Sequence, residues 1–161
     1  MDPCWLTEAR RHLGVREVPG VGNSPVIQRW LRTLHAWWSD DATPWCGVFV
    51  GYCLRECGCA PPAAWYRARA YLDWGHVQPV PSVGSITILE RGAASGHVMI
   101  AVGRTATNRI VGIGGNQGDR VSIASFDRAR VLGYRWPNEA IGSISYDALP
   151  VVNVAASGGE A

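Results

Sequence analysis

The chain has 161 residues, of which 47% are hydrophobic and 17% are charged. This length and composition are typical of one globular domain and exclude a disordered chain. The net charge is only +2, every one of the 15 cationic side chains is arginine, and the arginines form no stripe of the kind that binds nucleic acid, so a nucleic-acid partner is not expected.

Two helices are predicted in the first part of the chain. Residues 4–13 place apolar side chains on one face, and Gly14 follows as a stop signal. After a loop rich in turn formers, Ser24 is a suitable cap for a second helix that begins at Pro25. The apolar residues after Pro25 recur at helical spacing, so this helix should bury one face.

A third helix is predicted within residues 41–57. Thr43, or Asp41 if the helix begins earlier, is the expected cap, and Pro44 suits the first helical position. Cys46 then falls near the third position, where unpaired backbone N–H groups and the helix dipole favour a thiolate. We predict that Cys46 is a nucleophile, and the alternative is a small buried hydrophobic residue.

The chain contains five cysteines, an odd number, so they cannot all pair with one another. Cys53, Cys57 and Cys59 have a spacing that matches no common zinc site. We therefore expect buried free thiols, no metal and no cofactor.

The texture of the sequence changes after the third helix. Gly58 and Pro61-Pro62 end that helix, and a further short helix is expected over residues 63–74. Short β-branched segments separated by glycine-containing turns follow at residues 85–90, 97–102, 109–113, 120–124 and 131–136. Helices followed by strands predict an α+β fold, with N-terminal helices on a mainly antiparallel sheet of about five strands.

His97 and Asn116 are the predicted partners of Cys46. A hairpin centred near residues 106 and 107 would place residue 97 opposite residue 116. Directly opposed residues bring their Cβ atoms to roughly 4.5–5.5 Å, close enough for Asn116 to orient the imidazole of His97. Such a series of thiol, imidazole and carboxamide supports acyl transfer. The alternatives are a strand-end histidine satisfied by backbone and an asparagine that serves only its glycine-rich turn.

Four segments resemble, in this order, motifs of the CHAP amidohydrolases and peptidases. They are Thr43-Pro-Trp-Cys-Gly-Val-Phe-Val50, Gly96-His-Val98, Gly114-Gly-Asn-Gln-Gly118 and Leu132-Gly-Tyr-Arg-Trp-Pro137. The joint occurrence is more specific than any one motif. The resemblance spans residues 5–137 and is strongest to a single-domain, phage- and prophage-associated branch related to the NlpC-like cysteine hydrolases.

The resemblance implies a papain-like fold and one catalytic domain over residues 1–154. The composition of the chain end predicts, independently of the resemblance, a disordered tail at residues 155–161. It also implies Cys46 as nucleophile, His97 as base and Asn116 as orienting residue. Many CHAP members carry a glutamate where this chain has Gly114. The implied substrate is bacterial peptidoglycan, cleaved at an amide bond either by an N-acetylmuramoyl-L-alanine amidase or by a stem-peptide endopeptidase.

Further expectations concern the surroundings of the site and the place of action. Trp45, next to the nucleophile, is expected to form a wall of the substrate cleft. The sequence has no apolar run of the roughly 18 residues that span a bilayer and no signal-peptide pattern at its start. We expect a monomer that does not insert stably in membranes, cytoplasmic in the producing cell and active on the periplasmic or external wall after release, as a phage or prophage endolysin is.

Two alternatives to this function stay open. The first is a catalytically dead wall-binding module, which Gly114 in place of glutamate favours. The second is an interbacterial toxin that hydrolyses peptidoglycan.

Overall fold

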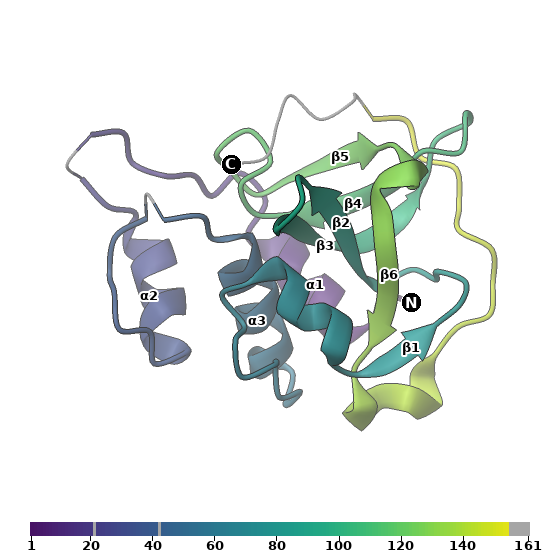
Figure 1. Cartoon of the computed structure of the whole chain (residues 1–161), viewed down its shortest axis with the longest axis horizontal. Coiled ribbons are helices and arrows are strands. Elements are labelled where there is room, and N and C mark those ends of the chain that lie inside the picture. The colour runs from purple at the N-terminus through teal and green to yellow at the C-terminus, as the bar shows by residue number, and fades with distance from the viewer. Residues whose placement is uncertain (21, 42, 155–161) are drawn as a thin grey trace.

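The computed structural model describes residues 1–20, 22–41 and 43–154, so the predicted tail at 155–161 lies outside the described residues. Helices come first in the chain and a sheet of six antiparallel strands follows (Figure 1). The predicted α+β fold class is therefore confirmed, with one strand more than expected.

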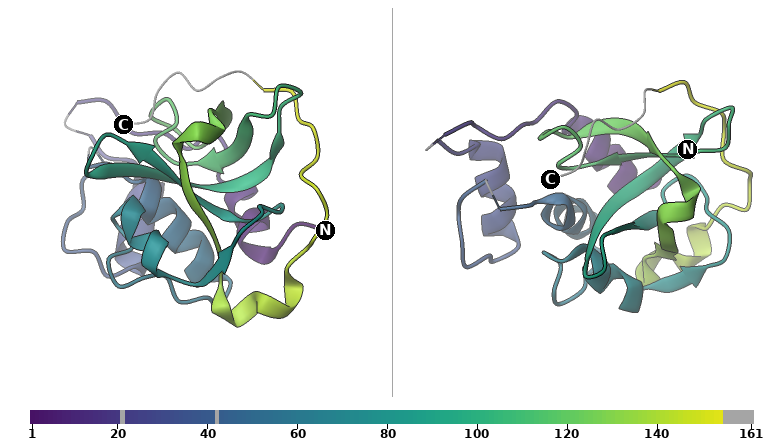
Figure 2. Two further views of the ribbon diagram at one scale, coloured as in Figure 1. Left: turned by 45° about the vertical axis from the view of Figure 1, so that its right-hand side comes forward. Right: turned by 45° about the horizontal axis from the view of Figure 1, so that its top comes forward.

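Three α-helices lie beside the sheet: α1 (Cys4–Arg11), α2 (Pro25–Thr33) and α3 (Cys46–Glu56). The Oγ atom of Ser24 accepts a hydrogen bond from the Ile27 N–H group at 3.4 Å, so α2 begins as predicted. Helix α3 is buried along most of its length and contacts α1, α2 and the sheet. It lies between α2 and the sheet, as Figure 1 and the right-hand view of Figure 2 show.

The sheet has the order β1-β6-β2-β3-β4-β5, and every neighbouring pair is antiparallel. The strands are β1 (His76–Gln78), β2 (Ile86–Arg91), β3 (Ser95–Arg104), β4 (Ile110–Gly114), β5 (Ser122–Phe126) and β6 (Val131–Trp136). Strand β3 is the longest and lies in the interior of the sheet, between β2 and β4. Its first residues therefore have fixed neighbours on the β2 side.

Two elements differ from the prediction. Strand β1 has only three residues, too few for an alternating pattern to be visible in the sequence. The short helix predicted at residues 63–74 is confirmed only in its second part, where turns lead into a 3-10 helix, η1 (Ala68–Asp73). Contacts with distant segments hold this region, because the Tyr71 hydroxyl donates to the Gly47 carbonyl at 2.8 Å and Arg69 binds backbone carbonyls of the β2–β3 loop.

Apolar side chains fill both faces of the sheet. The larger cluster lies between the helices and the sheet, and includes Val98 and Ile100 of β3. The smaller cluster uses the opposite face of β3, through Met99 and Ala101, together with Phe126 of β5. The C-terminal segment runs along the end of β3, where the Arg104 N–H group donates to the Pro150 carbonyl at 2.8 Å.

A disulfide between Cys4 and Cys57 joins the start of α1 to the residue that follows α3. The expectation of buried free thiols at Cys53, Cys57 and Cys59 is wrong for Cys57, because the packing of α1 against α3 brings its Cα atom to 5.9 Å from that of Cys4, within the range that a disulfide spans. The other three cysteines, Cys46, Cys53 and Cys59, are free and buried.

Among the described residues, no helix combines the length and the apolar character needed to cross a membrane.

Candidate active site

Cys46 is the first residue of α3. The helix begins two residues later than predicted: Trp45 is the capping residue, and the hydroxyl of Thr43 binds the Asp40 carboxylate instead of the helix. No side chain near in sequence caps the helix: the Trp45 N–H group instead donates to the side-chain oxygen of Asn116, in the turn after β4. Cys46 thus lies even closer to the positive end of the helix dipole than expected.

His97 meets Cys46 at one end of the sheet. Strand β4 ends at Gly114, so β3 has no strand partner on that side next to His97. The start of α3 occupies this place, where the backbone N–H group of Val98 donates to the sulfur of Cys46. The His97 ring is fully buried and packs against Phe126 with the ring centroids 5.5 Å apart.

The surroundings of Cys46 favour its thiolate. Burial acts to raise the pKa of the Cys46 thiol, but the hydrogen bond and charge of His97, the Val98 N–H group and the charge of Arg91 outweigh it and lower the pKa below its usual value. Cys53 lies on the same helix without such partners, and burial raises its pKa well above the usual value. Burial also raises the pKa of Cys59. Among the three free cysteines, lowering is confined to Cys46.

Both polar atoms of the Asn116 carboxamide bind groups other than the His97 imidazole, which does not support its predicted role as orienting residue. The side-chain oxygen of Asn116 accepts from the Trp45 N–H group, and its Nδ2 atom donates to Glu17 at 2.9 Å. The predicted pairing fails because the chain leaves β4 after Gly114 and turns at Asn116, whose φ is 56°. Residues 97 and 116 are therefore not opposed in the sheet.

Gln117 takes the orienting role. Its Oε1 atom lies 2.9 Å from Nε2 of His97. Its Nε2 atom donates to the Ser122 carbonyl at 2.7 Å, which fixes Oε1 as the acceptor. His97 therefore carries its proton on Nε2, and Nδ1 is the ring nitrogen that Gln117 does not engage. Sequence reasoning missed Gln117 although it stands beside the predicted residue in the same turn motif.

Gly114 makes room for Gln117. A Cβ atom at Gly114 would stand 2.5 Å from Oε1 of Gln117, too close for any real contact. Glycine in place of glutamate at position 114 favoured a catalytically dead module. In the structure, this glycine leaves the space through which the Gln117 carboxamide reaches His97. A larger residue at position 114 would therefore be incompatible with the observed position of the Gln117 side chain.

Glu17 binds both the segment that precedes Cys46 and the turn that carries Gln117. Its Oε1 atom accepts from the Trp45 indole at 2.7 Å and from Asn116 at 2.9 Å. Trp45 precedes Cys46 and Asn116 precedes Gln117, so one carboxylate holds both segments. Glu17 is separated from them by long stretches of sequence, and no motif in the sequence pointed to it.

Trp45 does not form a wall of the cleft as predicted. Its side chain is only 1% exposed and packs against Trp30 with ring centroids 5.8 Å apart. The indole is buried because its N–H group donates to Glu17 and its rings pack in the larger apolar cluster. A cleft of about 160 Å³ does open beside Cys46, and its lining includes Pro44 and Tyr66.

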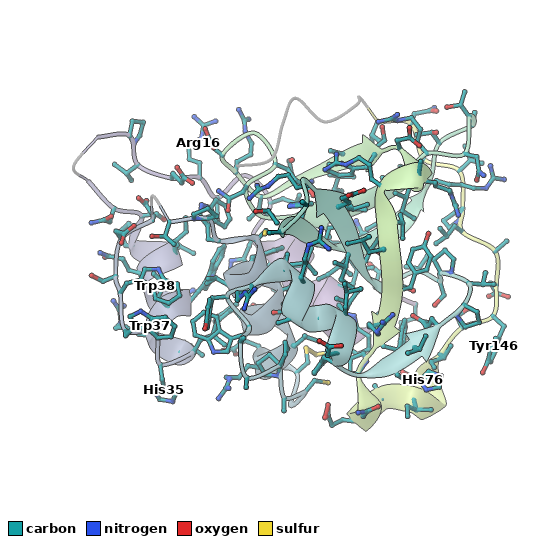
Figure 3. All side chains as sticks on the ribbon, viewed as in Figure 1. Arg16, His35, Trp37, Trp38, His76 and Tyr146 are labelled. Carbon is teal, nitrogen blue, oxygen red and sulfur yellow. A yellow bond between two sulfur atoms is a disulfide. The ribbon has the colours of Figure 1, made fainter. Side chains whose placement is uncertain are left out.

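An aromatic group flanks this cleft. Tyr66 contacts Trp37 with ring centroids 4.9 Å apart, and Trp38 stacks on Trp65 at 5.6 Å. Trp37 is 73% exposed, and Figure 3 shows Trp37 and Trp38 near α2. The residues described by the structure contain no cluster of three or more histidine, cysteine or acidic side chains that would hold a metal ion.

No protein-family model matches the chain, and no curated protein matches its sequence.

Proposed function

We propose that this protein is a cysteine amidohydrolase of papain-like architecture that cleaves an amide bond in bacterial peptidoglycan. One observation carries the proposal: Cys46, His97 and Gln117 form a connected series at a cleft, with the thiol pKa lowered and the imidazole tautomer fixed. The choice of peptidoglycan as substrate is supported by the resemblance of four ordered motifs to the CHAP enzymes.

The site supplies each group that thiol acyl transfer requires. The sulfur of Cys46 attacks the carbonyl carbon, and the new C–S bond pushes the carbonyl electrons onto oxygen. The backbone N–H group of Cys46, which has no acceptor within its helix, is suited to stabilise that oxyanion. Nδ1 of His97 gives its proton to the leaving nitrogen as the C–N bond breaks, and a thioester remains.

Water completes the cycle. Nδ1 of His97 takes a proton from water as the water oxygen attacks the thioester carbonyl. The C–S bond breaks, a carboxylic acid leaves, and Cys46 returns to its thiolate beside a protonated imidazole. Gln117 keeps the ring in one tautomer throughout, because its acceptor is fixed by the Ser122 carbonyl.

Replacement of Cys46 by alanine tests the proposal. We expect the hydrolysis of purified sacculi to fall at least a thousandfold, roughly the loss seen when a covalent nucleophile is removed. The thermal unfolding midpoint should stay close to that of the wild type. The matched control is Cys59→Ser, which removes another buried free thiol and should retain activity. Undiminished hydrolysis by Cys46→Ala would disprove the mechanism.

Mass spectrometry of the digested sacculi identifies the bond. Free stem peptides with a new amino terminus at alanine define an amidase, and any other new terminus defines an endopeptidase. A dead wall-binding module would bind sacculi and release no new termini.

A further inference from the structure

The cleft beside Cys46 is cationic. Its lining includes the three arginines Arg67, Arg69 and Arg91, and none of the described residues that line it is acidic. The charge of Arg91 reaches Cys46, since it contributes to the lowered pKa of that thiol. The nucleophile thus stands at the base of a positively charged recess.

Arg69 and Arg67 differ in their contacts. Arg69 is held by the Ser95 carbonyl at 2.8 Å and the Gly92 carbonyl at 2.9 Å, so it fixes the β2–β3 loop as well as adding charge. Arg67 is exposed, and no hydrogen bond or ion pair from a described residue engages its guanidinium. Its fork of donors is available to a ligand, and a carboxylate matches that fork in bidentate geometry.

The size of the recess limits what enters it. Its volume of about 160 Å³ is below the roughly 300–1,000 Å³ of sites for drug-sized ligands. It suits a single acidic group close to the reacting carbonyl better than a whole sugar ring.

We propose that the cleft selects acyl substrates that carry a carboxylate beside the scissile amide, and that Arg67 is the residue that binds this carboxylate. This inference rests on the proposed function for its substrate class, but the charge selection itself is measurable without any substrate.

Two alkylating reagents of similar size test the selection. Iodoacetate is an anion and iodoacetamide is neutral. In both reactions the thiolate of Cys46 forms a C–S bond with the methylene carbon of the reagent as the C–I bond breaks and iodide leaves. We expect the ratio of the iodoacetate rate to the iodoacetamide rate to be higher for Cys46 than for free cysteine, and to fall as salt is added. Peptide mapping assigns the labelled cysteine.

Arg67→Gln should lower the iodoacetate rate about threefold, as expected for one partly exposed charge, and leave the iodoacetamide rate unchanged. Arg67→Glu should lower it further. Arg32→Gln, which removes an exposed arginine of α2, is the matched control and should change neither rate. A rate ratio for Cys46 no higher than that of free cysteine, or an equal fall of both rates in Arg67→Gln, would overturn the inference.

A pair of stem peptides, one with a carboxylate next to the cleaved bond and one with a carboxamide there, separates this inference from the proposed function. Faster cleavage of the carboxylate peptide, lost in Arg67→Gln, supports both. Equal cleavage of the two peptides refutes the inference and leaves the hydrolase. Cleavage of neither peptide nor of sacculi refutes the proposed function, while the reagent rates still decide the charge selection.

Discussion

Asn116 and Gln117 are neighbours in sequence, yet their carboxamides serve different partners. Asn116 binds the start of α3, and Gln117 binds His97. The sequence indicated the correct turn and the correct chemical group but not the residue. Which of two adjacent amides points to the histidine depends on the positive φ of Asn116, and a motif alone does not contain that angle.

The residue scale yields a prediction on Gln117 and Gly114. Gln117→Ala should lower kcat about 10- to 100-fold, because the imidazole loses its fixed tautomer, and KM should change little. Gly114→Ala should have a similar effect, because its Cβ atom would displace the Gln117 carboxamide. Steady-state kinetics on a soluble stem peptide measures both.

The double variant provides the decisive comparison. If Gly114 acts only through Gln117, Gly114→Ala adds no further loss to Gln117→Ala, so the two effects are not additive. The matched control is Gly142→Ala, whose added Cβ atom has no neighbour within 4 Å and should leave kcat unchanged. Additive losses in the double variant would contradict the proposed coupling.

At the scale of elements, alternation and turn residues predicted five of the strands within a few residues. The predicted register between β3 and β4 is correct in the middle, where Ile100 pairs with Ile113. It fails nearer the hairpin, where a bulge shifts the pairing so that Arg104 faces Ile110. Bulges and strand ends depend on tertiary packing, and these are the features that place the site.

Glu17 connects three elements, and its ionisation has a defined effect on stability. Burial raises the pKa of Glu17 above its ordinary value of 4.5, and the charges of Asp119 and Asp41 raise it further, against the hydrogen bonds of Trp45 and Asn116. A raised pKa means that folding favours the protonated form. The contribution of Glu17 to stability is therefore complete below the ordinary pKa and is lost as the pH rises through the raised one.

Glu17→Gln should accordingly unfold at a higher temperature than the wild type at about pH 7.5, since it keeps a neutral acceptor without the buried charge. The gain should stay below about 1 kcal/mol because the carboxylate is partly exposed, and it should vanish near pH 4. Thermal unfolding followed by circular dichroism measures it. Glu17→Ala is the contrasting variant: it removes both hydrogen bonds and should lower stability and activity at every pH. A gain that persists at about pH 4 would contradict this account.

At the scale of the whole molecule, the disulfide is the largest departure from expectation. The even or odd count of cysteines says nothing about which two meet, and that choice follows from the packing of α1 on α3. The bridge joins residues 53 positions apart, so closing it removes much of the freedom of the unfolded chain.

Cys4→Ser should lower the free energy of unfolding by about 4 kcal/mol, the value expected from loop-closure entropy for a loop of this length. Denaturant titration with and without a reducing agent measures the loss. Reductant should destabilise the wild type by a similar amount and leave Cys4→Ser unaffected. An equal response of both proteins to reductant would show that the bridge does not form in solution.

Because of this disulfide, the stability of the fold depends on the redox potential of its surroundings. Where glutathione and thioredoxin keep thiols reduced, the disulfide between Cys4 and Cys57 does not form, and the fold has only its lower, reduced-state stability. In an oxidising space such as the periplasm, two thiols become a covalent staple. One sequence thus has a less stable reduced form and a more stable oxidised form of the same fold, and the redox potential of its surroundings decides between them.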